Sequence, residues 1–149
     1  MVKDSYHGNR KKEKGLTVVE TVVSLTVITI ISVGALSLAV FAANSRRRAD
    51  VSRYFSNLAD QSLKLYQTYE GNDFNDAFLL LTGQSISYET DGTYYLSSDY
   101  SYVGSSSDYD YTVTYDFEED SLKVTASYKD GDVIVERSTS RWKKDAVLL

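Results

Sequence analysis

One segment of 23 residues, 21–43, carries no formal charge, although Lys, Arg, Asp and Glu are dense on either side of it. A helix rises about 1.5 Å per residue, so roughly 20 apolar residues suffice to cross the hydrocarbon core of a bilayer. In lipid the backbone must satisfy its own hydrogen bonds, which favours a helix despite the many β-branched side chains. The segment is also longer than the apolar part of an ordinary secretory signal. We therefore expect a membrane-spanning helix here.

Positive charge is concentrated just before and just after this segment. Residues 1–15 hold five basic and two acidic side chains, a net charge of +3, so residues 16–149 carry −8 of the total of −5. An acidic exterior makes nucleic acid unsuitable as a direct partner, because phosphate binding needs clustered positive charge. The exceptions are Arg46, Arg47 and Arg48, which follow the apolar segment closely. Their position predicts contact with the membrane surface.

The composition excludes several kinds of active site. Cysteine is absent, so the chain has no disulfide, thiolate nucleophile or cysteine metal cluster. His7 is the single histidine, so a chain without residues 1–15 has no histidine-dependent triad or ordinary zinc site. The sequence contains no Gly-rich phosphate loop and no Ser-Lys arrangement. We expect no enzymatic activity, no cofactor and no metal site.

Glu20 is the unusual residue at the start of the apolar segment. An ionised carboxylate in a membrane helix is costly unless it has a partner or stays at the interface, where the positive helix N-terminus favours it. The segment 14–20, Lys-Gly-Leu-Thr-Val-Val-Glu, resembles the recognition site of prepilin peptidase in type IV pilins. The shared features are a short basic leader ending in Gly, a hydrophobic residue after the cut, and Glu as the fifth residue of the cut chain.

This resemblance covers the leader, the site and the apolar helix, and it implies how they are used. Cleavage falls between Gly15 and Leu16, and the new amine of Leu16 is N-methylated. The Glu20 carboxylate of one subunit then attracts the Leu16 amine of a neighbour, and Thr17 belongs to the same assembly segment. Charge attraction is strong at low dielectric, and pairing relieves two desolvation penalties. The chain departs from the family pattern in having Leu16 where Phe is commoner, and in having no proline to kink the helix.

Beyond the arginines, the sequence pattern changes twice. Apolar residues keep a helical stripe to about residue 70, where Gly71 and Asn72 indicate a stop. A second short helix is expected over residues 73–81, ending at Gly83. Alternating residues then predict strands over 84–90, 93–96, 109–117, 122–128 and 133–142. The first two strands are expected to form a hairpin through Asp91-Gly92, and the last three an antiparallel meander.

The expected fold is therefore α+β and pilin-like, with a long N-terminal helix packed on a small antiparallel β-sheet. The first half of that helix spans the membrane. The expected divisions are a basic leader that is removed, a transmembrane or filament-core helix, an amphipathic continuation of that helix, and a globular head with a short helix and the sheet, at residues 1–15, 16–43, 44–70 and 71–149.

Residues 97–110 are rich in Ser, Tyr and Asp and are expected to form an exposed loop. Asp99, Asp108 and Asp110 supply oxygen atoms of the kind that calcium prefers, but their spacing fits no EF-hand, so a solvated loop is favoured. Twelve of the 13 tyrosines follow residue 15, mostly in strand-like segments. Tyrosine is a good strand former, and it is also enriched at binding surfaces.

These features predict a structural subunit of a type IV pilus or related filament. Its partners would be prepilin peptidase, sister subunits, the assembly machinery and, before assembly, membrane lipid. The positive leader stays on the cytoplasmic side, so the C-terminal domain is expected outside the cytoplasm. One alternative is a pseudopilin of a secretion or competence system, which would meet DNA only indirectly. Another is an uncut, single-pass membrane protein with an extracytoplasmic binding domain, but that reading does not explain Gly15 and Glu20 together.

Overall fold

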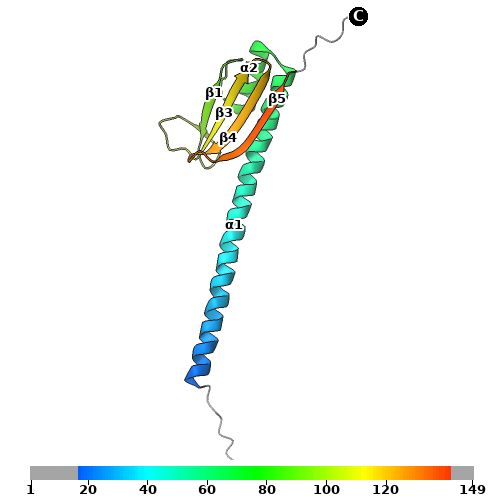
Figure 1. The fold of residues 1–149 in the computed structure, drawn as a ribbon. Coiled ribbons are helices and arrows are strands. Elements are labelled where there is room, and N and C mark those ends of the chain that lie inside the picture. The colour runs from blue at the N-terminus through cyan, green and yellow to red at the C-terminus, as the bar shows by residue number, and fades with distance from the viewer. Residues whose placement is uncertain (1–16, 142–149) are drawn as a thin grey trace, which may run out of the picture. The chain divides into compact units, whose positions relative to one another are not determined.

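The first helix is long and continuous. The computed structural model describes residues 17–141, and α1 runs over Val18–Thr68, 51 residues (Figure 1). The chain divides after Ser45 into two compact units, and α1 contributes residues to both. The helix predicted over residues 16–70 is confirmed in its described part, and it ends two residues earlier than expected. Leu16 lies outside the described residues.

A second helix, α2, spans Gly71–Thr82 and confirms the short helix predicted over residues 73–81. It ends where Gly83 adopts the left-handed conformation, with φ of 70°. The Gly83 N–H donates a hydrogen bond to the Leu79 carbonyl oxygen at 2.8 Å. A side chain is strained at this φ, so glycine is suited to end the helix here.

Within residues 17–141, five antiparallel strands form one sheet in the order β2-β1-β3-β4-β5. The strands are β1 Gly92–Leu96, β2 Tyr102–Val103, β3 Tyr111–Glu118, β4 Ser121–Tyr128 and β5 Val133–Ser140. The last three form the predicted meander. The predicted loop at 97–110 is mostly irregular but contains β2, which sequence reasoning missed because two residues give no alternation to detect.

The predicted strand over residues 84–90 is wrong, and so is the hairpin through residues 91–92. β1 pairs with β2 and β3, whereas residues 84–90 form an irregular connection. The Tyr88 N–H donates to Asn75 Oδ1 of α2 at 2.8 Å, so this backbone group is bound to the helix rather than to a neighbouring strand. Glu89 has a φ of 62°, which interrupts the extended conformation that a strand requires.

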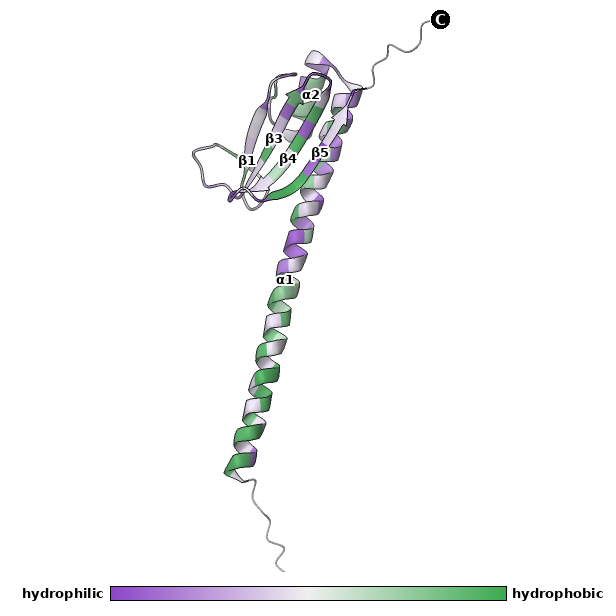
Figure 2. Ribbon diagram, viewed as in Figure 1, coloured by the Kyte–Doolittle hydropathy of each residue, from purple (hydrophilic) through white to green (hydrophobic). Residues whose placement is uncertain are grey.

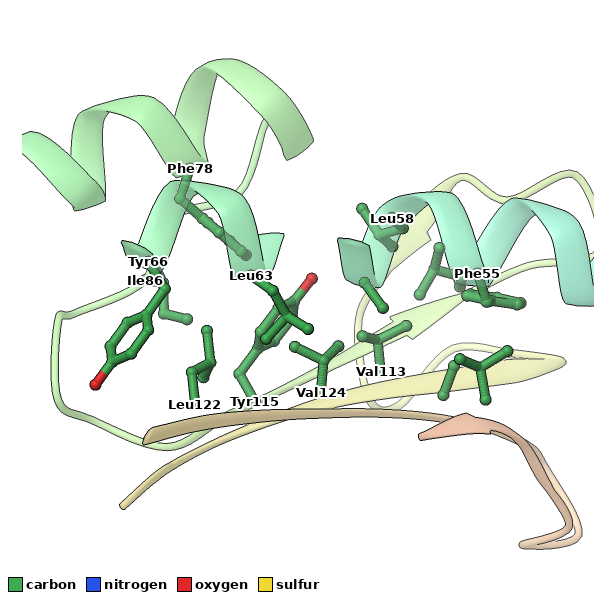
Figure 3. Close-up of a cluster of buried hydrophobic side chains, with 14 of the residues drawn as sticks. Phe55, Leu58, Leu63, Tyr66, Phe78, Ile86, Val113, Tyr115, Leu122 and Val124 are labelled. Carbon is green, nitrogen blue, oxygen red and sulfur yellow. The ribbon is translucent and has the colours of Figure 1, made fainter. Parts of the chain in front are cut away.

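One face of the sheet is covered by α2 and by the part of α1 that follows Ser45 (Figure 3). Alternate residues of β3 and β4 are buried on this face: Tyr111, Val113, Tyr115, Leu122, Val124 and Ala126. They meet a helical stripe of α1: Val51, Phe55, Leu58, Ala59, Ser62, Leu63 and Tyr66. Phe74 and Phe78 of α2 are fully buried in the same cluster. Each buried large side chain contributes about 1.5–3 kcal/mol, so this match of helix and strand periods stabilises the domain.

A short chain of hydrogen bonds crosses the centre of this core. The Tyr115 hydroxyl lies 3.3 Å from Ser62 Oγ, and both residues have no exposed surface. Ser62 Oγ donates to the Leu58 carbonyl oxygen at 2.8 Å. Because the Ser62 proton is used there, the Tyr115 hydroxyl donates to Ser62. Burial raises the pKa of the Tyr115 hydroxyl, so the hydroxyl keeps its proton and remains a donor.

Ser62→Ala should destabilise the protein more than Tyr115→Phe. The first change leaves a buried hydroxyl without an acceptor, at a cost of about 1–3 kcal/mol, whereas the second removes one hydrogen bond worth about 1 kcal/mol. The double variant should lie near Tyr115→Phe, because both polar partners are then gone. Urea unfolding of the full chain in detergent, followed by near-ultraviolet circular dichroism, measures these differences. Equal losses in the two single variants would contradict the assigned donor.

Candidate membrane and assembly helix

The first part of α1 exposes apolar side chains on all of its sides. Between Val18 and Phe41 the exposed fraction of the large hydrophobic residues ranges from 49% at Val27 to 80% at Val18. α1 contains a stretch long and apolar enough to cross a bilayer, and none of that stretch is buried by the described residues. Figure 2 shows the hydrophobic turns of α1 in green, followed by a hydrophilic section in purple. A helix that is apolar all round is normally covered by lipid or by other helices.

Four hydroxyl groups within this apolar part have partners in their own helix. Thr26, Thr29, Ser32 and Ser37 each donate a hydrogen bond of 2.8 Å to the carbonyl oxygen four residues earlier. A free hydroxyl in hydrocarbon would be costly, so these bonds make the four residues compatible with lipid or with a dry helix bundle. The apolar part of α1 is therefore more uniformly nonpolar in structure than its sequence suggests.

Thr17 and Glu20 satisfy each other's backbone at the start of α1. The Thr17 N–H donates to Glu20 Oε2, and the Glu20 N–H donates to Thr17 Oγ1, both at 3.3 Å. This reciprocal pair is a capping box, in which the N-cap residue and the third helical residue supply partners for free N–H groups. Its sequence signal, Thr-x-x-Glu before an apolar run, was present but was not used in the prediction. The predicted cleavage site, Gly15 and Leu16, lies outside the described residues.

The three arginines predicted to contact the membrane surface lie on α1, just beyond its apolar part. Arg46, Arg47 and Arg48 are all exposed. Within residues 17–141 none of them forms an ion pair. Their charges are therefore available to anionic headgroups, which attract basic residues that directly follow a membrane helix.

The three aspartates considered as calcium ligands are not brought together. Asp99 accepts hydrogen bonds from the Ser97 hydroxyl and from the Ser101 N–H, and the bond from Ser97 lowers the pKa of its carboxyl. Asp108 pairs with Lys129 Nζ at 2.7 Å, which lowers the pKa of the Asp108 carboxyl. In the described part of the chain, no group of three His, Cys, Asp or Glu side chains is placed to hold a metal ion. Asp99 and Asp108 instead fix turns and strand ends.

Comparison with models of protein families, with curated proteins and with solved structures gives no significant match for this chain. The start of α1 and its apolar part are the features with the most specific chemistry.

Thr17→Val should loosen the first turn of α1, because it removes the side-chain oxygen that accepts the Glu20 N–H. Loss of an N-cap costs about 1 kcal/mol, equivalent to about fivefold faster amide exchange in that turn. Thr17→Ser keeps the oxygen and is the matched control. Hydrogen exchange of the full chain in detergent micelles measures the effect. If Thr17→Val and Thr17→Ser exchange at the same rate, the hydroxyl does not cap the helix.

Proposed function

We propose that this chain is the precursor of a type IV pilin-like subunit, cut after Gly15, held in the membrane by the apolar part of α1 and assembled through that helix into a filament. The observation that carries the proposal is the exposed apolar first part of α1, with one carboxylate, Glu20, in its first turn. The basic leader and Gly15 before it supply the recognition site. The proposal covers pilus and pseudopilus subunits alike, because both use the same segment.

The exposed apolar side chains of α1 need a cover that the described part of this chain does not supply. Lipid supplies it while the subunit is stored in the membrane. In a filament, sister helices supply this cover. Lipid tails are as apolar as the side chains themselves, so moving from lipid to a bundle brings no hydrophobic gain, and van der Waals packing holds the helices together. The internally bonded hydroxyls of Thr26, Thr29, Ser32 and Ser37 suit both environments.

Glu20 gives the proposed assembly its axial register. Cleavage after Gly15 creates an ammonium group at Leu16, and a neighbour's Glu20 carboxylate is the nearest compensating charge in an apolar bundle. Attraction between opposite charges is stronger there than in water, and an unpaired charge would be costly. The capping box uses only one carboxylate oxygen, Oε2. The other oxygen, Oε1, can accept a hydrogen bond from the neighbouring amine while the cap stays in place.

The second compact unit, which begins at Arg46, is proposed to lie outside the cytoplasm. A leader of net charge +3 favours the cytoplasmic side, which directs the other end of a single membrane helix outward. The exposed arginines at 46–48 would then lie at the headgroups of the outer leaflet, whose phosphate groups can accept hydrogen bonds from guanidinium groups. An uncut anchor would have the same orientation, so processing has to be tested directly.

The purified membrane-extracted protein should begin with an N-methylated Leu16, as read by mass spectrometry of its N-terminal peptide. Gly15→Val should block this processing, because a side chain at the cut prevents close approach of the scissile backbone. Gly8→Val is the matched control, since it adds the same side chain elsewhere in the leader and should leave processing intact. Recovery of native chains that still begin at Met1 would favour the uncut anchor.

Glu20→Gln should abolish most incorporation into filaments, as should Glu20→Val. Glutamine keeps an oxygen that can accept the Thr17 N–H, so it retains the cap but removes the charge. Membrane insertion and cleavage should stay largely intact in both variants. Immunoblots of sheared filament and membrane fractions measure incorporation. If Glu20→Gln assembles normally and Glu20→Val does not, capping and not charge pairing is the role of this residue.

A further inference from the structure

The outer side of α2 carries the most exposed large hydrophobic side chain among residues 17–141. Leu80 is 88% exposed and Leu79 is 47% exposed, whereas Phe74 and Phe78 on the inner side of α2 have no exposed surface. Isolated exposed leucines are common on proteins. Consecutive residues are about 100° apart around a helix, so Leu79 and Leu80 lie at the two margins of one exposed strip of α2.

Two acidic residues share this side of the helix. Asp73 and Asp76 are exposed, and residues three, four and seven apart lie on one side of a helix, which places them in line with Leu80. Neither aspartate forms an ion pair within the described residues. The outer face of α2, defined here as Asp73, Asp76, Leu79 and Leu80, therefore has acids near its start and leucines near its end.

Arg141, the last described residue, is fixed beside the start of α2. Its Nη2 donates to the carbonyl oxygens of Tyr66 and Tyr69 at 3.0 and 2.9 Å. Its Nη1 lies 3.1 Å from Glu70 Oε1, and its guanidinium lies 4.7 Å from the centre of the Tyr66 ring. Glu70 is the N-cap residue of α2. The chain therefore continues beyond Arg141 from the end of α2 at which the acids lie.

Residues 142–149 contain basic residues followed by apolar ones, which matches the acids and then the leucines along the outer face of α2. Trp142 is followed by two lysines at 143–144, then by a single acid, Asp145, and by the apolar sequence Ala-Val-Leu-Leu at 146–149, so the basic residues precede the apolar ones. We propose that this C-terminal tail docks along the outer face of α2, with its lysines against the two aspartates and its apolar residues against the two leucines. The tail would thereby cover the apolar surface that α2 leaves exposed.

The lengths agree with this arrangement. Leu80 lies ten residues beyond Glu70, roughly 15 Å along the helix axis, and eight extended residues reach up to roughly 26 Å. Burial of the leucines supplies the attraction, while the surface ion pairs mainly fix the direction in which the tail lies. This docking does not depend on cleavage or on filament assembly, so it stands or falls separately from the proposed function.

Disulfide trapping in the full chain tests the docking, because the native sequence has no cysteine. Leu79→Cys combined with Val147→Cys should form an intramolecular disulfide about tenfold faster than Ser138→Cys combined with Val147→Cys. Ser138 is exposed and lies three residues before Arg141, so it is at least as close to the tail by reach alone. Equal rates in the two pairs would overturn the proposal. Predominantly disulfide-linked dimers would also overturn it, in favour of a second copy as the occupant.

A charge exchange within the Leu79→Cys/Val147→Cys pair tests the direction of the tail. Adding Asp76→Lys alone or Lys144→Glu alone should slow the intramolecular disulfide several-fold, and adding both should restore the rate. If Asp76→Lys, Lys144→Glu and their combination all leave the rate unchanged, the proposed ion pairing is overturned. Loss of the disulfide in nanodiscs but not in detergent would show that lipid takes the tail, and would overturn the docking as well.

Discussion

The helix α1 has to satisfy two different environments along one continuous backbone. Its first part presents apolar side chains in every direction, and its later part, beyond Ser45, buries only one stripe against a sheet. The change occurs at three consecutive arginines, 46–48, whose charges are incompatible with hydrocarbon. The rest of the fold follows from this division, because the sheet and α2 cover the later part of the helix and leave the apolar side chains of the earlier part exposed.

The sheet is fixed on α1 by both shape and polarity. Phe55 and Tyr66 of the helix make ring contacts with Tyr111 of β3 and with Phe117 at the far end of that strand. Apolar packing alone tolerates small shifts, whereas the buried contact of Tyr115 with Ser62 is satisfied in one register. The polar contact in the core therefore contributes specificity as well as stability.

Sequence periodicity was sufficient for the elements with a one-sided burial pattern. The α1 stripe, α2 with its Gly83 stop, and the meander β3-β4-β5 follow from spacings of 3.6 or 2 residues. The alternation at residues 84–90 misled because Tyr88 is held by Asn75, a tertiary contact that no local pattern contains. At the start of α1, Glu20 stood out in the sequence because its charge lies directly before an apolar run, and its proposed role in assembly stays a prediction. Its bond with Thr17 was missed although the capping signal was readable, while the Arg141 contacts depend on residues more than 70 positions apart.

The order of the strands makes β2 and β5 the edge strands of the sheet, and both have features that oppose pairing with a strand of another molecule. β2 has two residues, too few to template a ladder. β5 carries Glu136 and Arg137, which are held by Lys123 and Asp60 at 3.2 and 3.8 Å. Short edge strands and charged side chains on an edge are the usual protection against edge-to-edge aggregation. Many copies of such a domain can be crowded at one surface without merging into amyloid-like material.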